Sequence, residues 1–163
     1  MIEQWLDLVD AQIRLVALEC FTVDRGLIIA EFANFSQEKN LPLYYWNSGY
    51  PEIQEVGKKE LGYHRLSPSS IQVEPDNILR SHLLHNQPGI YLLADLVDFE
   101  NLTPKKRVRR ESEILNLIDQ CRFSSVPCYF VLMGSYINFS DQLKEVEVIS
   151  YPLPDKLSNI HIA

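Results

Sequence analysis

Apolar residues follow two kinds of spacing along this chain, and the two spacings predict different elements. Five short runs are almost continuously apolar, at residues 15–21, 43–46, 90–94, 127–132 and 146–150. Short runs without polar alternation are typical of strands that are buried on both faces of a parallel sheet. Around residues 5–13, apolar positions recur at helical spacing between carboxylates, which predicts an amphipathic opening helix.

Three longer helices are predicted between these strands. The first extends from an N-cap at Asp24 to a break at residues 39–42, and the second covers residues 76–85. The third begins with Thr103 as N-cap and Pro104 at the first helical position, and runs to about Arg122. Its inward-facing residues are expected to be Val108, Ile114, Leu115, Leu117 and Ile118.

Two segments have weaker patterns. Residues 138–143 are expected to form about one helical turn. Glycine and proline interrupt every candidate element in residues 47–74, which leaves either an exposed excursion or a short hairpin.

The alternation of strands and helices predicts an α/β fold, a three-layer sandwich around a mostly parallel five-stranded sheet. The length of 163 residues fits one domain, which we assign to residues 1–155, with a loose tail at 156–163. Ligands of such sheets bind beyond the carboxyl ends of the strands. The loops at 22–26, 47–49, 95–99 and 133–136 are therefore expected to converge.

Composition narrows the classes of function. The net charge of -7 argues against the broad basic surface that sequence-neutral nucleic-acid binding requires. No apolar run approaches the roughly 20 residues that cross a bilayer, so membrane insertion is not expected. The acidic beginning of the chain has no leader pattern, and the three cysteines suit buried free thiols. These features predict a cytoplasmic or plastid-stromal protein.

The loop after the first strand lacks the residues that hydrolyse a nucleotide. A phosphate-binding loop needs glycines and a lysine, whereas residues 22–26 offer Asp24, which would repel a triphosphate, and no lysine. Asp95 ends the third strand, and Asp98 follows it, where active P-loop proteins hold Mg²⁺. Without a phosphate loop to share the metal, termination of the strand is the favoured role. The candidate ligand-binding residues are Asp24, Arg25, Asp95 and Asp98, and no cofactor or metal is predicted.

Positive charge is concentrated at the start of the third helix. One interpretation is a binding site for an acidic partner, and the other is a solvated helix face paired with Glu111 and Glu113. Cations in a first helical turn oppose the helix dipole, so their placement is slightly unfavourable for the fold and gives some support to the binding site. The solvated helix face is nevertheless the favoured interpretation. The candidate partner-binding residues are Lys105, Lys106, Arg107, Arg109 and Arg110.

Several short motifs occur in the order of one known family. They are Phe-Thr-Val-Asp-Arg at 21–25, Pro-Leu-Tyr-Tyr-Trp at 42–46, Pro-Gly-Ile-Tyr-Leu-Leu-Ala-Asp at 88–95, Val-Leu-Met-Gly-Ser at 131–135 and Tyr-Pro-Leu-Pro-Asp at 151–155. With the arginine-rich helix between them, the chain resembles the N-terminal domain of AAA-type ATPases first described as a conserved reading frame of algal plastids and cyanobacteria. The resemblance implies a degenerate, AAA-like variant of the P-loop-NTPase topology. The family's catalytic module would begin where this chain ends, so no ATPase activity is implied.

These observations predict a non-catalytic accessory or regulatory domain that binds a protein, either an AAA-type ATPase or a second copy of itself. The alternative is a sensor that binds a small ligand or nucleotide without hydrolysing it. No catalytic constellation is present in the sequence, so an enzyme is not predicted.

Overall fold

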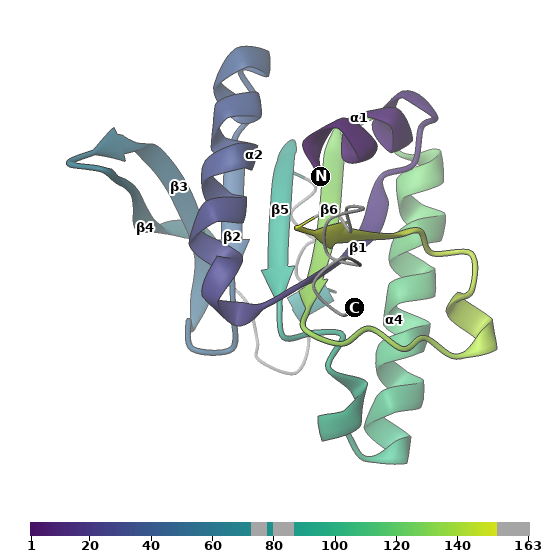
Figure 1. Cartoon of the computed structure of the whole chain (residues 1–163). Coiled ribbons are helices and arrows are strands. Elements are labelled where there is room, and N and C mark those ends of the chain that lie inside the picture. Colours follow the sequence, from purple (N-terminus) through teal and green to yellow (C-terminus); the bar gives the residue numbers. More distant parts are fainter. Residues whose placement is uncertain (73–77, 80–86, 153–163) are drawn as a thin grey trace, which may run out of the picture.

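The centre of the molecule is a seven-stranded sheet with the order β4-β3-β2-β5-β6-β1-β7 (Figure 1). The computed structural model describes residues 1–72, 78–79 and 87–152. Its strands are β1 (Leu15–Cys20), β2 (Leu43–Trp46), β3 (Glu52–Glu60), β4 (Tyr63–Gln72), β5 (Gly89–Ala94), β6 (Cys128–Gly134) and β7 (Val148–Tyr151). The neighbouring strands from β2 through β5, β6 and β1 to β7 pair in parallel. The mostly parallel α/β arrangement is therefore confirmed.

The expected number of five strands is wrong, because residues 52–72 add two more. β3 pairs antiparallel with β2 and with β4, so the weakly patterned segment is a hairpin that extends the sheet. Its turn consists of Leu61 and Gly62, both with positive φ. Ile53 and Ile71 of the hairpin belong to the core on one face of the sheet, and Val56 and Leu66 pack against the core on the other face, but the residues nearer the turn are exposed. The hairpin therefore lacks the continuous apolar runs that identify the parallel strands.

Helices cover both faces of the sheet. α1 (Ile2–Asp10) and α2 (Arg25–Lys39) pack on one face, where Trp5 meets the ring of Phe32 edge-on with the centroids 5.1 Å apart. α4 (Pro104–Phe123) packs on the other face, as does the helical pair Ile78 and Leu79. The rest of the helix predicted at 76–85 and the tail at 156–163 lie outside the described residues.

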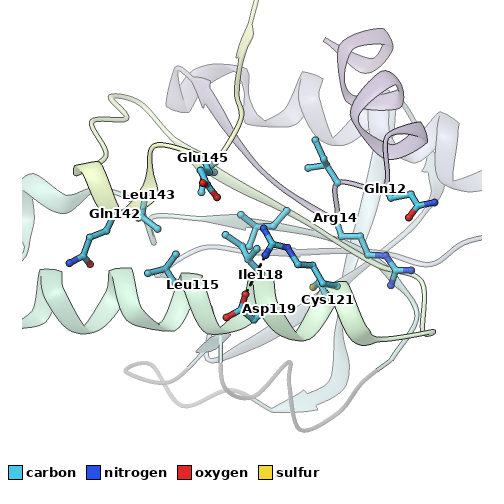
Figure 2. Close-up of a pocket in the computed structure, with 13 residues that line it drawn as sticks. Gln12, Arg14, Leu115, Ile118, Asp119, Cys121, Gln142, Leu143 and Glu145 are labelled. Carbon is cyan, nitrogen blue, oxygen red and sulfur yellow. Dashed lines mark ion pairs between the residues drawn. The ribbon is translucent and has the colours of Figure 1, made fainter.

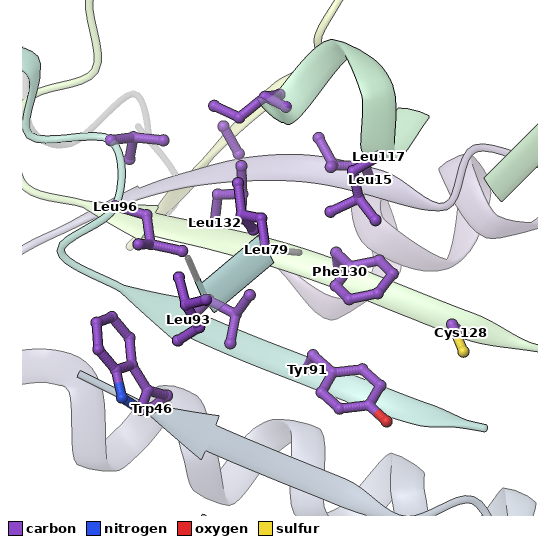
Figure 3. Packing of buried hydrophobic residues seen from close by; sticks show 14 of the residues in the cluster. Leu15, Trp46, Leu79, Tyr91, Leu93, Leu96, Leu117, Cys128, Phe130 and Leu132 are labelled. Atoms are coloured by element: carbon purple, nitrogen blue, oxygen red, sulfur yellow. The ribbon is translucent and has the colours of Figure 1, made fainter. Parts of the chain in front are cut away.

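The core on the α4 face is built by alternate residues of the strands. Tyr91 and Leu93 of β5 point to this face, whereas Ile90 and Leu92 belong to the core under α1 and α2. Figure 3 shows Tyr91 next to Phe130 of β6, and their rings stack with centroids 5.2 Å apart. Both faces of the central strands are thus buried, which explains their unbroken apolar sequences.

α4 begins as the sequence predicts, but one of its expected core residues is exposed. Thr103 Oγ1 accepts a hydrogen bond from Lys106 N at 3.3 Å, and Pro104 is the first helical residue. Val108, expected to face inward, is 62% exposed. The buried residues of this helix, Glu111, Ile114, Leu117 and Cys121, form one stripe along its inner face. One turn before Glu111, this stripe continues at Arg107. Val108 is rotated away from that stripe.

The connections leave the two central strands toward opposite faces. The chain crosses from β1 to β2 through α2, on the α1–α2 face. It crosses from β6 to β7 through η3 (Asp141–Leu143), whose Leu143 packs into the core on the α4 face. β1 and β6 are neighbouring parallel strands whose outgoing connections cross opposite faces of the sheet, and in open α/β sheets such a point forms a crevice for ligands. Among the described residues, no helix is long and apolar enough to span a membrane.

Candidate functional site

Three of the four loops at the carboxyl edge of the sheet meet at Asp95. Arg25 at the start of α2 places Nη2 at 2.7 Å from Asp95 Oδ1. Ser48, after β2, donates to Asp95 Oδ2 from its backbone N at 3.0 Å and from its Oγ at 2.8 Å. Asp95 itself has a φ of 69°, a left-handed conformation that aspartate tolerates better than most residues. The expected convergence of these loops is confirmed.

The fourth loop, after β6, packs closely against the loop after β5. A Cβ atom added at Gly134 would lie 2.8 Å from Val97 Cγ2, so no larger residue fits without displacement. Further along, Ile137 N donates to Glu19 Oε2 at 3.1 Å. Glu19 belongs to β1 and Ile137 follows β6, so this bond links the carboxyl ends of the two neighbouring strands whose connections cross opposite faces.

The pair of Arg25 and Asp95 is electrostatically stable. Burial alone would raise the pKa of Asp95, but hydrogen bonds from Ser48 and Arg25 outweigh it and lower the pKa below its usual value. Burial alone would lower the pKa of Arg25, but the hydrogen bond and charge of Asp95 raise it. Both groups are therefore charged at neutral pH and bonded to each other.

The two remaining candidate ligand residues are placed differently. Burial raises the pKa of Asp98, and the negative charge of Asp95 raises it further. Asp24 occupies the N-cap position of α2, as predicted, but its side chain accepts no capping hydrogen bond.

Burial raises the pKa of Cys20 to about 11, so this thiol is protonated at neutral pH. Cys20, Cys121 and Cys128 are all free and buried, as expected.

Ser48 and Glu19 both form hydrogen bonds at this edge, and neither is among the site residues predicted from the sequence. Ser48 lies in a loop that was expected at the edge, but a serine between asparagine and glycine has no distinctive pattern. Glu19 had a usable signal, because it is a carboxylate within an otherwise apolar strand. Within the part of the chain that is described, no three histidine, cysteine or acidic residues are grouped so that they could hold a metal ion.

Apolar side chains project from the same edge. Phe21 is 65% exposed, Val23 is 89% exposed and Leu27 is 58% exposed. All three lie on the connection from β1 into α2, beside Arg25. Large exposed apolar groups that are close in sequence are typical of surfaces that contact other proteins. We call Phe21, Val23 and Leu27 the edge patch.

Most arginines of the basic cluster interact within the fold. Arg107 Nε lies 3.6 Å from Glu111 Oε1, and Arg109 Nε lies 3.5 Å from Glu113 Oε1. Arg110 Nη1 donates to Leu96 O at 2.7 Å, which ties α4 to the loop after β5. The pairing with Glu111 and Glu113 is therefore present. A partner-binding role of this cluster stays a prediction, and Lys105, Lys106 and Arg109 are its exposed members.

A pocket of about 310 Å³ lies away from this edge, between α4 and the beginning of β1 (Figure 2). Its walls include apolar side chains such as Ile118 and Leu143. Two cations and two anions lie among its lining residues, and Arg122 Nη1 is 3.7 Å from Asp119 Oδ1. The guanidinium of Arg14 already donates to Val126 O at 2.6 Å. The pocket therefore has no clear preference for the charge of a ligand.

No protein-family model matches this chain, and no curated protein sequence matches it. The carboxyl edge brings together a closed polar cluster and an exposed apolar patch. The polar groups there are bonded to one another, whereas the apolar groups face solvent.

Proposed function

We propose that this chain is a non-catalytic protein-interaction domain, an accessory or regulatory unit related to the N-terminal part of an AAA-type ATPase. The observation that carries the proposal is the contrast at the carboxyl edge. Arg25, Ser48 and Asp95 satisfy one another, while the neighbouring edge patch is left in solvent.

The closed polar cluster argues against a site for phosphate chemistry. A nucleotide would have to compete with Asp95 for Arg25, and it would approach Asp24 and Asp98 as well. The loop after β1 offers no glycine-rich cradle of backbone N–H groups, because residues 22–24 form a short 3-10 turn that leads directly into α2. These features favour binding without catalysis.

The edge patch has the chemistry of a protein-binding surface. Aromatic and aliphatic anchors that become buried contribute most of the energy of protein interfaces. Phe21 follows the end of β1, Val23 lies in the 3-10 turn at residues 22–24, and Leu27 lies in the first turn of α2. The partner is an AAA-type ATPase or a second copy, as the resemblance implies. The order β2-β5-β6-β1-β7 of the parallel strands is compatible with the P-loop-NTPase-like topology that this relation requires.

The test is a comparison of two variants in a pull-down from native cell extract with identification by mass spectrometry. Replacing Phe21, Val23 and Leu27 together by serine should abolish recovery of the specific partner, because the apolar anchors are lost. A matched control replaces Val108 and Phe123 by serine, which are 62% and 89% exposed on α4, and should retain the partner. Melting temperatures of both variants should remain close to that of the unchanged protein.

Two outcomes would overturn the proposal. One is recovery of the same proteins by the edge-patch variant. The other is a rise in melting temperature on adding magnesium and a nucleotide that is absent in Asp95→Ala, which would show that the chain is a sensor whose ligand binds through the Asp95 carboxylate. A ligand at 100 times its dissociation constant stabilises the fold by about 2.7 kcal/mol, which such a measurement detects readily.

A further inference from the structure

The turn of the β3–β4 hairpin contains a leucine in an unfavourable conformation. Leu61 has a φ of 51° and Gly62 a φ of 88°, so both residues of this turn are left-handed. Such turns favour asparagine or aspartate followed by glycine, and a residue with a larger side chain is strained there. Leu61 is also 99% exposed, so its side chain gains no burial in return. A leucine that is unfavourable for the fold in both respects points to a role outside the fold.

The surroundings of Leu61 form a basic tip with an apolar apex. Tyr63 is 78% exposed beside it. Lys58, Lys59 and Arg65 are exposed nearby, with Glu60 as the carboxylate among them, in a chain whose net charge is -7. The hairpin extends away from the body of the molecule (Figure 1). We call residues 58–65 the hairpin tip.

The groove between α1 and α2 has the opposite character. It has a volume of about 430 Å³, and Ile2, Leu6 and Phe35 contribute apolar walls. Glu3, Glu31 and Glu38 also line it, and no lysine, arginine or histidine side chain does. It is a concave, apolar and acidic surface, whereas the hairpin tip is a protruding, apolar and basic one.

We infer that the hairpin tip of one copy docks into the α1–α2 groove of a second copy. Leu61 enters the apolar part of the groove, and the cations of the tip approach Glu3 and Glu38, both exposed. Complementary charge selects the partner and the orientation, while burial of the leucine supplies the apolar contact. The two surfaces differ, so the contact is heterologous: it closes into a ring or a reciprocal dimer, or it continues as a chain.

The inference builds on the proposed interaction function by naming one partner, but it uses residues apart from the edge patch. Variants of Phe21, Val23 and Leu27 should leave the salt-dependent contact between the hairpin tip and the groove unchanged. A failure of the hairpin contact and a failure of the edge patch are therefore distinguishable.

The experiment is sedimentation velocity of the purified full chain over a range of concentrations at low and high salt. The unchanged protein should associate as its concentration rises, more strongly at low salt. Leu61→Asn replaces the leucine by a residue that suits the left-handed conformation, so the variant should be as stable as the unchanged protein or more stable. Its association should weaken about tenfold or more, because a central apolar contact is removed.

Charge reversal identifies the two surfaces. The variant Lys58→Glu with Lys59→Glu and the variant Glu3→Lys with Glu38→Lys should each be monomeric alone. An equimolar mixture should form a heterodimer, since the intact tip of the second variant can still enter the intact groove of the first. Lys105→Glu with Lys106→Glu, a change of the same size on α4, should associate as the unchanged protein does. A protein that stays monomeric at every concentration, or a Leu61→Asn variant that associates equally well, would overturn the inference.

Discussion

Asp95 and Asp98 lie three residues apart at the end of β5, yet their environments shift the pKa values in opposite directions. Asp95 receives hydrogen bonds from Ser48 and Arg25 that lower its pKa despite burial. Burial and the charge of Asp95 raise the pKa of Asp98. Ionisation of Asp98 therefore opposes folding, whereas ionisation of Asp95 supports it.

Asp98→Asn should consequently make the protein more stable at neutral pH. The pKa of Asp98 is raised in the folded state, so its stabilising contribution is full below the ordinary aspartate pKa of 3.8 and is lost as pH rises through the folded pKa. The variant should have a larger free energy of unfolding at pH 7 and equal that of the unchanged protein below pH 3.8. Urea unfolding at both pH values measures this, with Asp7→Asn, an exposed aspartate of α1, as control. An equal or smaller free energy of unfolding at pH 7 would contradict it.

At the scale of elements, the sequence predicted those whose signals are local, and it left a short hairpin as one of two alternatives for the segment whose structure depends on pairing. Thr103 and Pro104 predicted the beginning of α4 correctly, because helix capping involves only neighbouring residues. The sequence does not identify the hairpin because Gly57 and Pro68 interrupt the apolar pattern of its strands, and because Leu61-Gly62 is not a typical turn sequence. Its strands are defined by their partners across the sheet.

The cap of α4 gives a test at this scale. Thr103→Ala removes the oxygen that accepts from Lys106 N, and should lower the free energy of unfolding by about 1 kcal/mol. Thr103→Ser keeps that oxygen and should remain close to the unchanged protein. Thermal or urea unfolding distinguishes them, and equal losses in both variants would show that the threonine methyl group matters instead.

At the scale of the whole molecule, the class of fold was predictable and the placement of its parts was not. Unbroken apolar strands between helices identify a parallel sheet from composition alone. The candidate residues Arg25 and Asp95 were assigned to one edge, but their direct pairing at 2.7 Å depends on contacts across 70 positions of the chain. The hydrogen bond between Glu19 and Ile137 likewise cannot be predicted without knowing the order of the strands.

Trp5 joins the layers on the α1–α2 face. Its ring meets Phe32 and Phe35 of α2 at 5.1 Å and Tyr129 of β6 at 5.9 Å, all edge-on. Trp5→Ala should therefore lower the free energy of unfolding by about 3–5 kcal/mol, the range for a large buried aromatic residue. Leu8→Ala, at a half-buried position of the same helix, should have a smaller effect. Urea unfolding compares the two, and a loss no larger than that of Leu8→Ala would show that α1 is not held by this ring.

The position of β1 has a consequence for how the chain is made. β1 pairs with β6 on one side, as in Leu15 with Phe130, and with β7 on the other, as in Ala17 with Val148. Both neighbours emerge from the ribosome more than a hundred residues after it. Pairing over such separations makes folding slow, and exposed strands invite aggregation while they wait. During synthesis, this strand therefore remains without its sheet partners until more than a hundred further residues have been translated, which is the interval in which a nascent chain most needs a chaperone.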